Sequence, residues 1–520
     1  MARLSIHQET GRAEGVENSH LLEELSDGKE AYPDEVSPQR HLTWPVVRRL
    51  AWPFVQRHTS QAAFFLLPSF VQSRLRPQPV KPEKLHPTAF LDGMRGLAAL
   101  FVFFYHLSYS SHDVLTAYGA GEDGQNREFL KLPFVRFIYT GPTMVAIFYV
   151  VSGFALSYKP VRQMRGHKWS DLLHTISSSI FRRALRLYLP CIISTLLIVF
   201  LVRMGIYELT RDIANDWKRL PNVRETHLHH FDTTSEQLND WAHKMWTFIH
   251  PWSFGTKDTD IDIDRHLWTI PMEFRSSLVL YLTQAGVARM KPLLRLATIG
   301  GLIIWCLFKD RWEMVLFYSG FFFAELNFMR GALSMSDNSA RGGLLGRLPS
   351  LRPSQTKRLW SAFWLSIFLV GIYLGSQPQQ GAEHSPGWAT LTSLVPSFAE
   401  HKQRYWVSWG AILLVWSTSN APFLQRIFDN APVQYLGKIS FALYLMHGPV
   451  THTIGYGSMD ILWRLIGTDT YLRKEIGFCI AAIIDIGTTV CVADFFWRAV
   501  DIPIVRFGKW FEDKCIVKIE

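Results

Sequence analysis

The stretch Ala89–Ser110 reads AFLDGMRGLAALFVFFYHLSYS, an apolar run that contains one arginine and one histidine. As a helix it is long enough to cross the roughly 30 Å of hydrocarbon in a bilayer. Ionisable side chains are costly inside such a helix, so Arg95 and His106 are functional candidates. At about 100° per residue, both side chains fall on one face, about 16 Å apart along the axis. The alternative is an arginine that snorkels to the surface and a histidine bonded to a neighbouring carbonyl.

The rest of the chain has the composition of a polytopic membrane protein. It has 520 residues, 48% of them hydrophobic and 19% charged, below the roughly 25% charged residues of a soluble domain. Apolar runs of about 18 to 23 residues recur after a polar start. We predict an all-α fold of about ten transmembrane helices, at 88–108, 137–158, 185–205, 267–287, 294–308, 312–330, 360–375, 406–420, 436–455 and 476–497.

The loop charges predict the orientation of these helices. Lys and Arg gather in the connections after the second, fourth and sixth spans and in the C-terminal tail, which places both termini in the cytosol. The first thirty residues contain no apolar core of a signal peptide. We therefore expect a multi-pass protein of the endoplasmic reticulum or another endomembrane, with Arg95 nearer the cytosol and His106 nearer the lumen.

The chain divides into four parts. Residues 1–43 are predicted to be a disordered polar tail, and 44–85 an amphipathic juxtamembrane segment, either on the membrane surface or packed on the bundle. The transmembrane domain is expected over 86–505, with a large lumenal loop at 206–265, and a short basic cytosolic tail over 506–520.

Two partner classes are disfavoured by the residues alone. The net charge of +10 comes from basic residues that flank membrane segments, so it gives no indication of a nucleic-acid partner. The five cysteines have neither metal-site nor disulfide-framework spacing. The loop sequence HLHHFD at 227–232 offers metal-type side chains without a companion motif, and we expect no metal.

Five motifs, taken together and in order, carry a family resemblance. They are FLDGMRGLAALFVFFYH (90–106), IFYVVSGFALSY (147–158), FRRALRLYLP (181–190), HLWTIPMEF (266–274) and LGKISFALYLMHGPV (436–450). The set resembles the membrane acyltransferase-3 family, which has about ten spans and an Arg-x10-His first helix. The long polar N-terminus and the large loop between the third and fourth spans are most similar to those of fungal members.

The resemblance implies transfer of an acyl group, commonly acetyl, from acyl-CoA to a hydroxyl. No bound cofactor is implied, and acetyl-CoA is a co-substrate. His106 matches the catalytic histidine of the family, as general base or as a nucleophile that carries the acyl group. Arg95 would contact the CoA phosphates or the donor carbonyl. Whether the acceptor arrives from the lumen, the cytosol or the lipid stays open.

Further site candidates follow from the same motifs. Glu273 is expected to be catalytic, by orienting a histidine or ordering the donor pocket, although Phe274 stands where a second Glu is common. For acyl-donor binding the candidates are Arg182, Arg183 and Arg186, which would otherwise be membrane anchors. The remaining candidates are His266, Trp268, His447 as a second catalytic histidine, a gate or a structural bond, and Asp92 as a helix cap or a partner of Arg95.

The acceptor is the least determined part of the prediction. The aromatic-rich membrane segments suit a small lipophilic alcohol, so we expect an enzyme of fungal secondary metabolism. A glycan or glycolipid acceptor is the first alternative. A transporter is the second, although its usual internal repeats are not visible, and an unrelated histidine-dependent membrane O-acyltransferase is the third.

Overall fold

The computed structural model describes residues 64–75, 85–120, 126–223, 225, 227–250, 252, 261–337 and 353–517. From Phe65 onward these residues belong to one compact unit. The expected disordered tail at 1–43 lies outside the described residues, as does most of the expected juxtamembrane segment.

The described chain is helical throughout, and the only β interaction within it is an isolated bridge between Thr116 and Gln380. Its α-helices are α3 (Ser69–Leu75), α4 (Ala89–Ser108), α5 (Gly141–Arg165), α6 (Trp169–Arg203), α7 (Glu208–Ala214), α8 (Thr234–Phe248), α9 (Thr269–Val287), α10 (Pro292–Phe308), α11 (Trp312–Asp337), α12 (Pro353–Gly375), α13 (Trp388–Ser393), α14 (Lys402–Asn420), α15 (Pro422–Phe428), α16 (Ala431–Val450), α17 (Tyr456–Ile466), α18 (Tyr471–Phe496) and α19 (Ile502–Cys515). Short 3-10 helices form η2 (Phe129–Lys131), η3 (Arg136–Tyr139), η5 (Arg265–Trp268) and η7 (Ala382–His384), and π-helices form η8 (Thr451–Gly455) and η9 (Trp497–Asp501).

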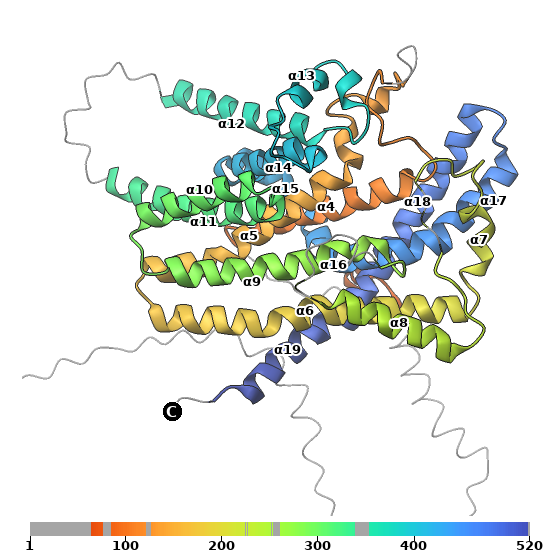
Figure 1. Cartoon of the computed structure of the whole chain (residues 1–520), viewed down its shortest axis with the longest axis horizontal. Coiled ribbons are helices and arrows are strands. Elements are labelled where there is room, and N and C mark those ends of the chain that lie inside the picture. The colour runs from red at the N-terminus through yellow and green to blue at the C-terminus, as the bar shows by residue number, and fades with distance from the viewer. Residues whose placement is uncertain are drawn as a thin grey trace, which may run out of the picture. The chain divides into compact units, whose positions relative to one another are not determined.

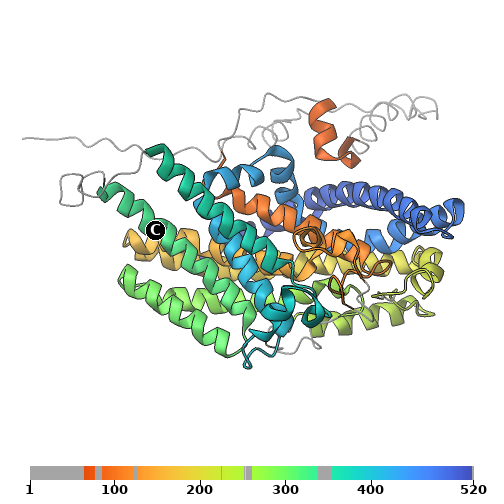
Figure 2. The ribbon, with the colours of Figure 1, turned by 90° about the horizontal axis from the view of Figure 1, so that it is seen from above.

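Every expected span overlaps one of these helices, and the long helices run side by side in Figures 1 and 2. Within the described residues, five helical segments are long and apolar enough to cross a membrane. They are α4, α5, α6, residues 357–375 of α12, and the continuous run 471–515 through α18, η9 and α19. The all-helical fold is thereby confirmed, while the number of ten spans stays a prediction.

Glycines bring the central helices into backbone contact. A Cβ on Gly153 of α5 would lie 2.2 Å from the Phe317 carbonyl oxygen of α11, and one on Gly320 would lie 2.3 Å from the Val150 oxygen. Gly96 and Gly437 make the same kind of approach between α4 and α16. Small residues at such crossings let membrane helices gain dispersion energy where lipid removes the hydrophobic driving force.

Buried ion pairs tie other helices together. Glu325 of α11, which is fully buried, accepts hydrogen bonds from Arg295 of α10 at 2.9 and 3.0 Å and from Arg165 of α5 at 2.7 and 2.9 Å. Because a buried carboxylate is stable only when its charge is paired, this triad fixes α5, α10 and α11 relative to one another.

Two terminal segments attach to the bundle. In the N-terminal segment, the Ser69 amide donates to the buried Asp494 of α18 at 3.0 Å, and Arg498 donates to the carbonyl oxygens of Phe65 and Leu67. At the other end, residues 506–515 form most of α19 rather than a free tail. This helix packs against α6, where Glu512 pairs with Arg182 at 2.8 Å.

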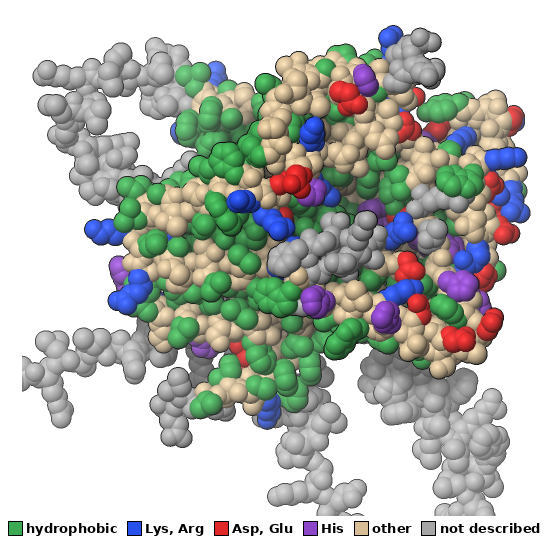
Figure 3. All heavy atoms as spheres, viewed as in Figure 1, with side chains coloured by type: hydrophobic (Ala, Val, Ile, Leu, Met, Phe, Trp, Pro, Cys, Tyr) green, Lys and Arg blue, Asp and Glu red, His purple; other side chains and the backbone are tan. Residues whose placement is uncertain are grey.

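The connection between α6 and α9, expected as the large lumenal loop, contains α7 and α8. Helix α8 begins with a capping box, in which the Glu236 amide donates to Thr233 Oγ1 and the Thr233 amide to the Glu236 carboxylate. Charged and histidine side chains gather over the end of the molecule formed by α7, α8 and α17, as Figure 3 shows. Polar side chains there fit a region outside the hydrocarbon.

Candidate active site

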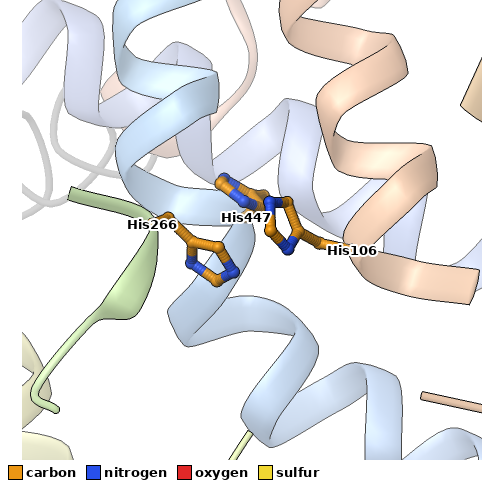
Figure 4. Close-up of side chains that lie close together, drawn as sticks. All are labelled: His106, His266 and His447. Atoms are coloured by element: carbon orange, nitrogen blue, oxygen red, sulfur yellow. The ribbon is translucent and has the colours of Figure 1, made fainter. Parts of the chain in front are cut away.

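Three histidines from distant parts of the chain meet at one end of the bundle. His106 lies in the last turn of α4, His447 lies near the end of α16, and His266 belongs to η5 just before α9. Their ring centroids are 4.0 Å apart for His106 and His266, 4.3 Å for His266 and His447, and 5.3 Å for His106 and His447. Figure 4 shows the three rings pointing toward one another.

A glutamate that the sequence analysis did not select lies against this cluster. Glu225 precedes α8 and is 8% exposed. Its Oε1 lies 2.8 Å from His266 Nε2 and 3.4 Å from His106 Nδ1, and its Oε2 lies 2.7 Å from His452 Nε2 in η8. One carboxylate therefore contacts histidines of three elements.

His266 lies between two carboxylates. Its Nδ1 is 2.7 Å from Asp264 Oδ1, and its Nε2 faces Glu225. Burial alone lowers the pKa of His266, but the charges of Glu225 and Asp264 outweigh it and raise the pKa to about 10. The two neighbouring carboxylates therefore favour the protonated form of His266, in which both ring nitrogens donate hydrogen bonds. The ring nitrogens of His106, His266 and His447 also lie within 4.8 Å of one another, a proximity that metal sites share.

His447 is held in one tautomer. Its Nδ1 donates to the Tyr444 carbonyl oxygen at 2.7 Å, which leaves the lone pair on Nε2. That nitrogen is buried and has no hydrogen-bond partner among the described residues. His447 therefore makes a structural hydrogen bond and also presents a free basic nitrogen to the cluster.

A cavity of about 470 Å³ lies among α4, α5, α6, α9, α16, η9 and α19. Its volume falls in the roughly 300–1,000 Å³ range of small-molecule sites. Apolar side chains, Phe148 and Leu187 among them, line one part of it. The charged lining residues are Arg95, Arg183, Arg186, Lys438, Arg506, Glu273 and Asp501. Bases outnumber acids, so the cavity favours an anionic ligand with an apolar part.

Three predicted donor-binding arginines thus reach the same cavity. Arg95 is held by Ser440 Oγ at 3.0 Å and by Asp92 at 3.6 Å, which makes Asp92 its partner rather than a helix cap. Arg182 is directed elsewhere: it pairs with Glu512 and lines a smaller neighbouring pocket that Arg183 and Arg186 share.

Glu273 lies in the cavity and not against a histidine in its described contacts. It accepts from Arg183 Nη2 at 2.8 Å and from Ser152 Oγ at 3.1 Å. Of its two predicted roles, the position fits ordering of the pocket. The reason is helical spacing: Glu273 lies well along α9, whereas His266 precedes that helix. The carboxylate that faces His106 is Glu225.

The cavity and the histidine cluster adjoin at Tyr444. Its ring lines the cavity, and its hydroxyl donates to the carbonyl oxygen of His266 and lies 2.7 Å from Thr269 Oγ1. Trp268 lies between His266 and Thr269 in the sequence. The guanidinium of Arg404 lies over its ring, 5.1 Å from the ring centroid. Tyr444 is therefore the residue through which the cavity lining and the histidine cluster are in contact.

Sequence reasoning missed Glu225, Asp264 and His452. Glu225 and Asp264 lie in the polar connection before α9, where carboxylates are ordinary surface residues and carry no motif. For His452 the sequence holds one weak signal, because this histidine follows the LYLMH motif closely. The structure adds that it lies in a π-helix, a distortion that is frequent at functional sites.

The chain is similar over most of its length to a family of known proteins and to individual fungal proteins. The acyltransferase domain family matches residues 88–493. The chain is 31% identical over 466 residues to O-acetyltransferase PaAT-1 of Phomopsis amygdali, covering 86% of this chain and 87% of that protein. It is 26% identical to acyltransferase R4 of a Phoma species (81% and 94% covered) and 24% identical to acyltransferase clz18 of Cochliobolus lunatus (80% and 94%). No solved structure matches the chain significantly.

Proposed function

The chain belongs to the acyltransferase-3 domain family, and from that premise we propose that it transfers an acetyl group from acetyl-CoA to a hydroxyl of a small lipophilic metabolite. The observation that carries the proposal is the arrangement of a basic-and-apolar cavity beside a histidine cluster, joined at Tyr444. The relative named an O-acetyltransferase supports acetyl as the acyl group.

The chemistry proposed for the cluster is general-base catalysis by His106. Its Nε2 accepts the proton of the acceptor hydroxyl while the oxygen attacks the thioester carbonyl carbon. The tetrahedral intermediate then collapses, the C–S bond breaks, and the CoA thiolate takes the proton from His106. The products are an ester and CoA thiol, and His106 returns to its neutral form.

The cavity is proposed to hold acyl-CoA as a co-substrate, without a resident cofactor. Guanidinium groups of Arg95, Arg183 and Arg186 offer several donors each to phosphate oxygens. Glu273 neutralises part of this charge through Arg183 and fixes the direction of that guanidinium. The apolar lining suits the pantetheine arm and the acyl group.

The proposed topology has ten spans, both termini in the cytosol and an endomembrane location. The loop charge and the parallel course of α4 and α16 support this topology, in which the cavity would lie toward the cytosol and the histidines toward the lumen. Glycosylation acceptor sites inserted in the 206–265 connection should be modified in microsomes, and sites after Cys515 should not.

The test begins with gene deletion and a search for the metabolite that loses an acetyl group. With that acceptor, His106→Ala should lower kcat by about 10²- to 10⁴-fold while acetyl-CoA still binds. His384→Ala, at an exposed histidine, is the control and should change nothing. A His106→Ala protein of undiminished turnover would contradict the mechanism. Solute movement across vesicles without consumption of acetyl-CoA would favour a transporter.

A further inference from the structure

The feature that the proposed reaction leaves unexplained is Glu225. It lies in a connection of the chain that bears no recognisable motif, and yet its side chain is buried. Both of its oxygens contact histidines: His106 and His266 share Oε1, and His452 contacts Oε2. A carboxylate buried in this way is costly unless each oxygen has partners of opposite charge or hydrogen-bond donors.

The balance of these effects keeps Glu225 anionic. Burial alone raises the pKa of Glu225. The charge of His266, the hydrogen bonds from His266 and His452, and the nearby ring of His106 outweigh burial and hold the pKa well below its usual range. Asp264 also pairs with His266, through Nδ1. The charge of His266 is therefore shared between two carboxylates, and Glu225 keeps negative charge that can interact with His106.

The contact determines which nitrogen of His106 can react. A neutral imidazole beside a carboxylate is most stable with its N–H toward that carboxylate, so the contact favours the His106 tautomer with the proton on Nδ1 and the lone pair on Nε2. The Nδ1–Oε1 separation of 3.4 Å is longer than the usual hydrogen bond between charged groups, about 2.7–2.9 Å, and Nδ1 has no hydrogen-bond partner among the described residues. The separation can shorten when His106 takes the proton of the acceptor.

We propose that Glu225 is the positioning residue of acyl transfer, which holds the reactive tautomer of His106 and stabilises the imidazolium formed during the reaction. This inference rests on the proposed function. Glu225 acts through His106 and need not touch the substrate. His452 fixes the outer oxygen of Glu225, so the connection between α6 and α9 must fold against η8 before the site is complete.

Glu225→Gln is the first test, because it keeps the shape and removes the charge. Glu208→Gln, at a half-exposed ion pair with Arg211 in neighbouring α7, is the matched control. We expect Glu225→Gln to lower kcat by about 10²-fold or more, as an orienting carboxylate does in other base-assisted acyl transfers, with the KM for acetyl-CoA unchanged. The control should retain wild-type kcat.

A second variant separates orientation from folding. Glu225→Ala removes the carboxylate, and a small pocket lined by Glu225, Asp264, His266 and His452 adjoins the position. Added formate should restore part of the kcat of Glu225→Ala, which a purely structural loss would not allow. Glu225→Asp, which keeps the charge on a shorter arm, should have a kcat between those of wild type and Glu225→Gln.

The outcomes are distinct. Wild-type kcat in Glu225→Gln would overturn the positioning role and leave the proposed function intact. If Glu225→Gln does not accumulate as folded protein, no response of Glu225→Ala to formate would overturn it. A wild-type protein that transfers no acyl group would instead refute the proposed function itself.

Discussion

Gly96 of α4 and Gly437 of α16 are in backbone contact, and the same number of residues farther along each helix His106 lies against His447. A Cβ on Gly96 would come 2.4 Å from the amide nitrogen of Gly437, and one on Gly437 would come 2.5 Å from the carbonyl oxygen of Asp92. The two helices therefore run parallel and in register, and their glycine contact sets the spacing of the histidines.

We predict that Gly437→Ala separates these helices. The added methyl group meets backbone that cannot give way, so we expect a cost of about 1–3 kcal/mol and a larger fractional loss of kcat than of folded protein, because the histidines move apart. Gly487→Ala in α18, where no atom lies within 4 Å of the new Cβ, should leave both unchanged. Equal kcat in the two variants would contradict this view of the α4–α16 contact.

Arg95→Gln should weaken the binding of acetyl-CoA and leave kcat nearly unchanged. Loss of one charged hydrogen bond to phosphate costs about 1.5–3 kcal/mol, which corresponds to a rise of about 10- to 150-fold in the KM for acetyl-CoA. With S-acetylpantetheine, which lacks the nucleotide phosphates, wild type and variant should be nearly equal. Arg473→Gln, at an exposed ion pair with Asp469, serves as control. An equal rise in KM with acetyl-CoA and with S-acetylpantetheine would show that Arg95 does not bind the nucleotide phosphates.

His266 should make stability depend on pH in a defined direction. Its raised folded-state pKa stabilises the fold fully below the unfolded pKa of about 6.5, and that contribution is lost as pH rises through the folded pKa of about 10. The melting temperature of wild type should therefore exceed that of His266→Gln most near pH 6, and the difference should shrink toward pH 10. A difference that grows with pH would show that His266 is neutral in the fold.

Glu325→Gln should destabilise the protein without touching the site. The change leaves Arg165 and Arg295 with uncompensated charge, and breaking a buried pair typically costs about 3–5 kcal/mol. Thermal unfolding in detergent measures the effect, and the surviving folded fraction should keep its KM values. Glu383→Gln, at an exposed pair with His384, should melt as wild type does. Equal melting of the two variants would mean that the triad contributes little.

The sequence by itself determined the long helices, the two polar residues of α4 and much of the cationic lining of the cavity. Apolar runs and flanking charge located every long helix, because hydrocarbon admits only segments that satisfy their own backbone hydrogen bonds. Helical spacing placed Arg95 and His106 on one face, and the cationic lining of the cavity followed from motifs on α4 and α6. Residues 506–515 were predicted as part of a tail because of their charges, although they belong to α19, which packs against α6.

Only the tertiary structure decided which residues surround His106. Glu225, Asp264 and His452 carry no local pattern, since a carboxylate in a polar connection has the same sequence signature whether it faces water or a buried histidine. Their roles arise from contacts between elements far apart in the chain, where burial makes pairing obligatory. These contacts also decided between the two roles predicted for Glu273, which pairs with Arg183 in the cavity lining, whereas Glu225 lies beside His106.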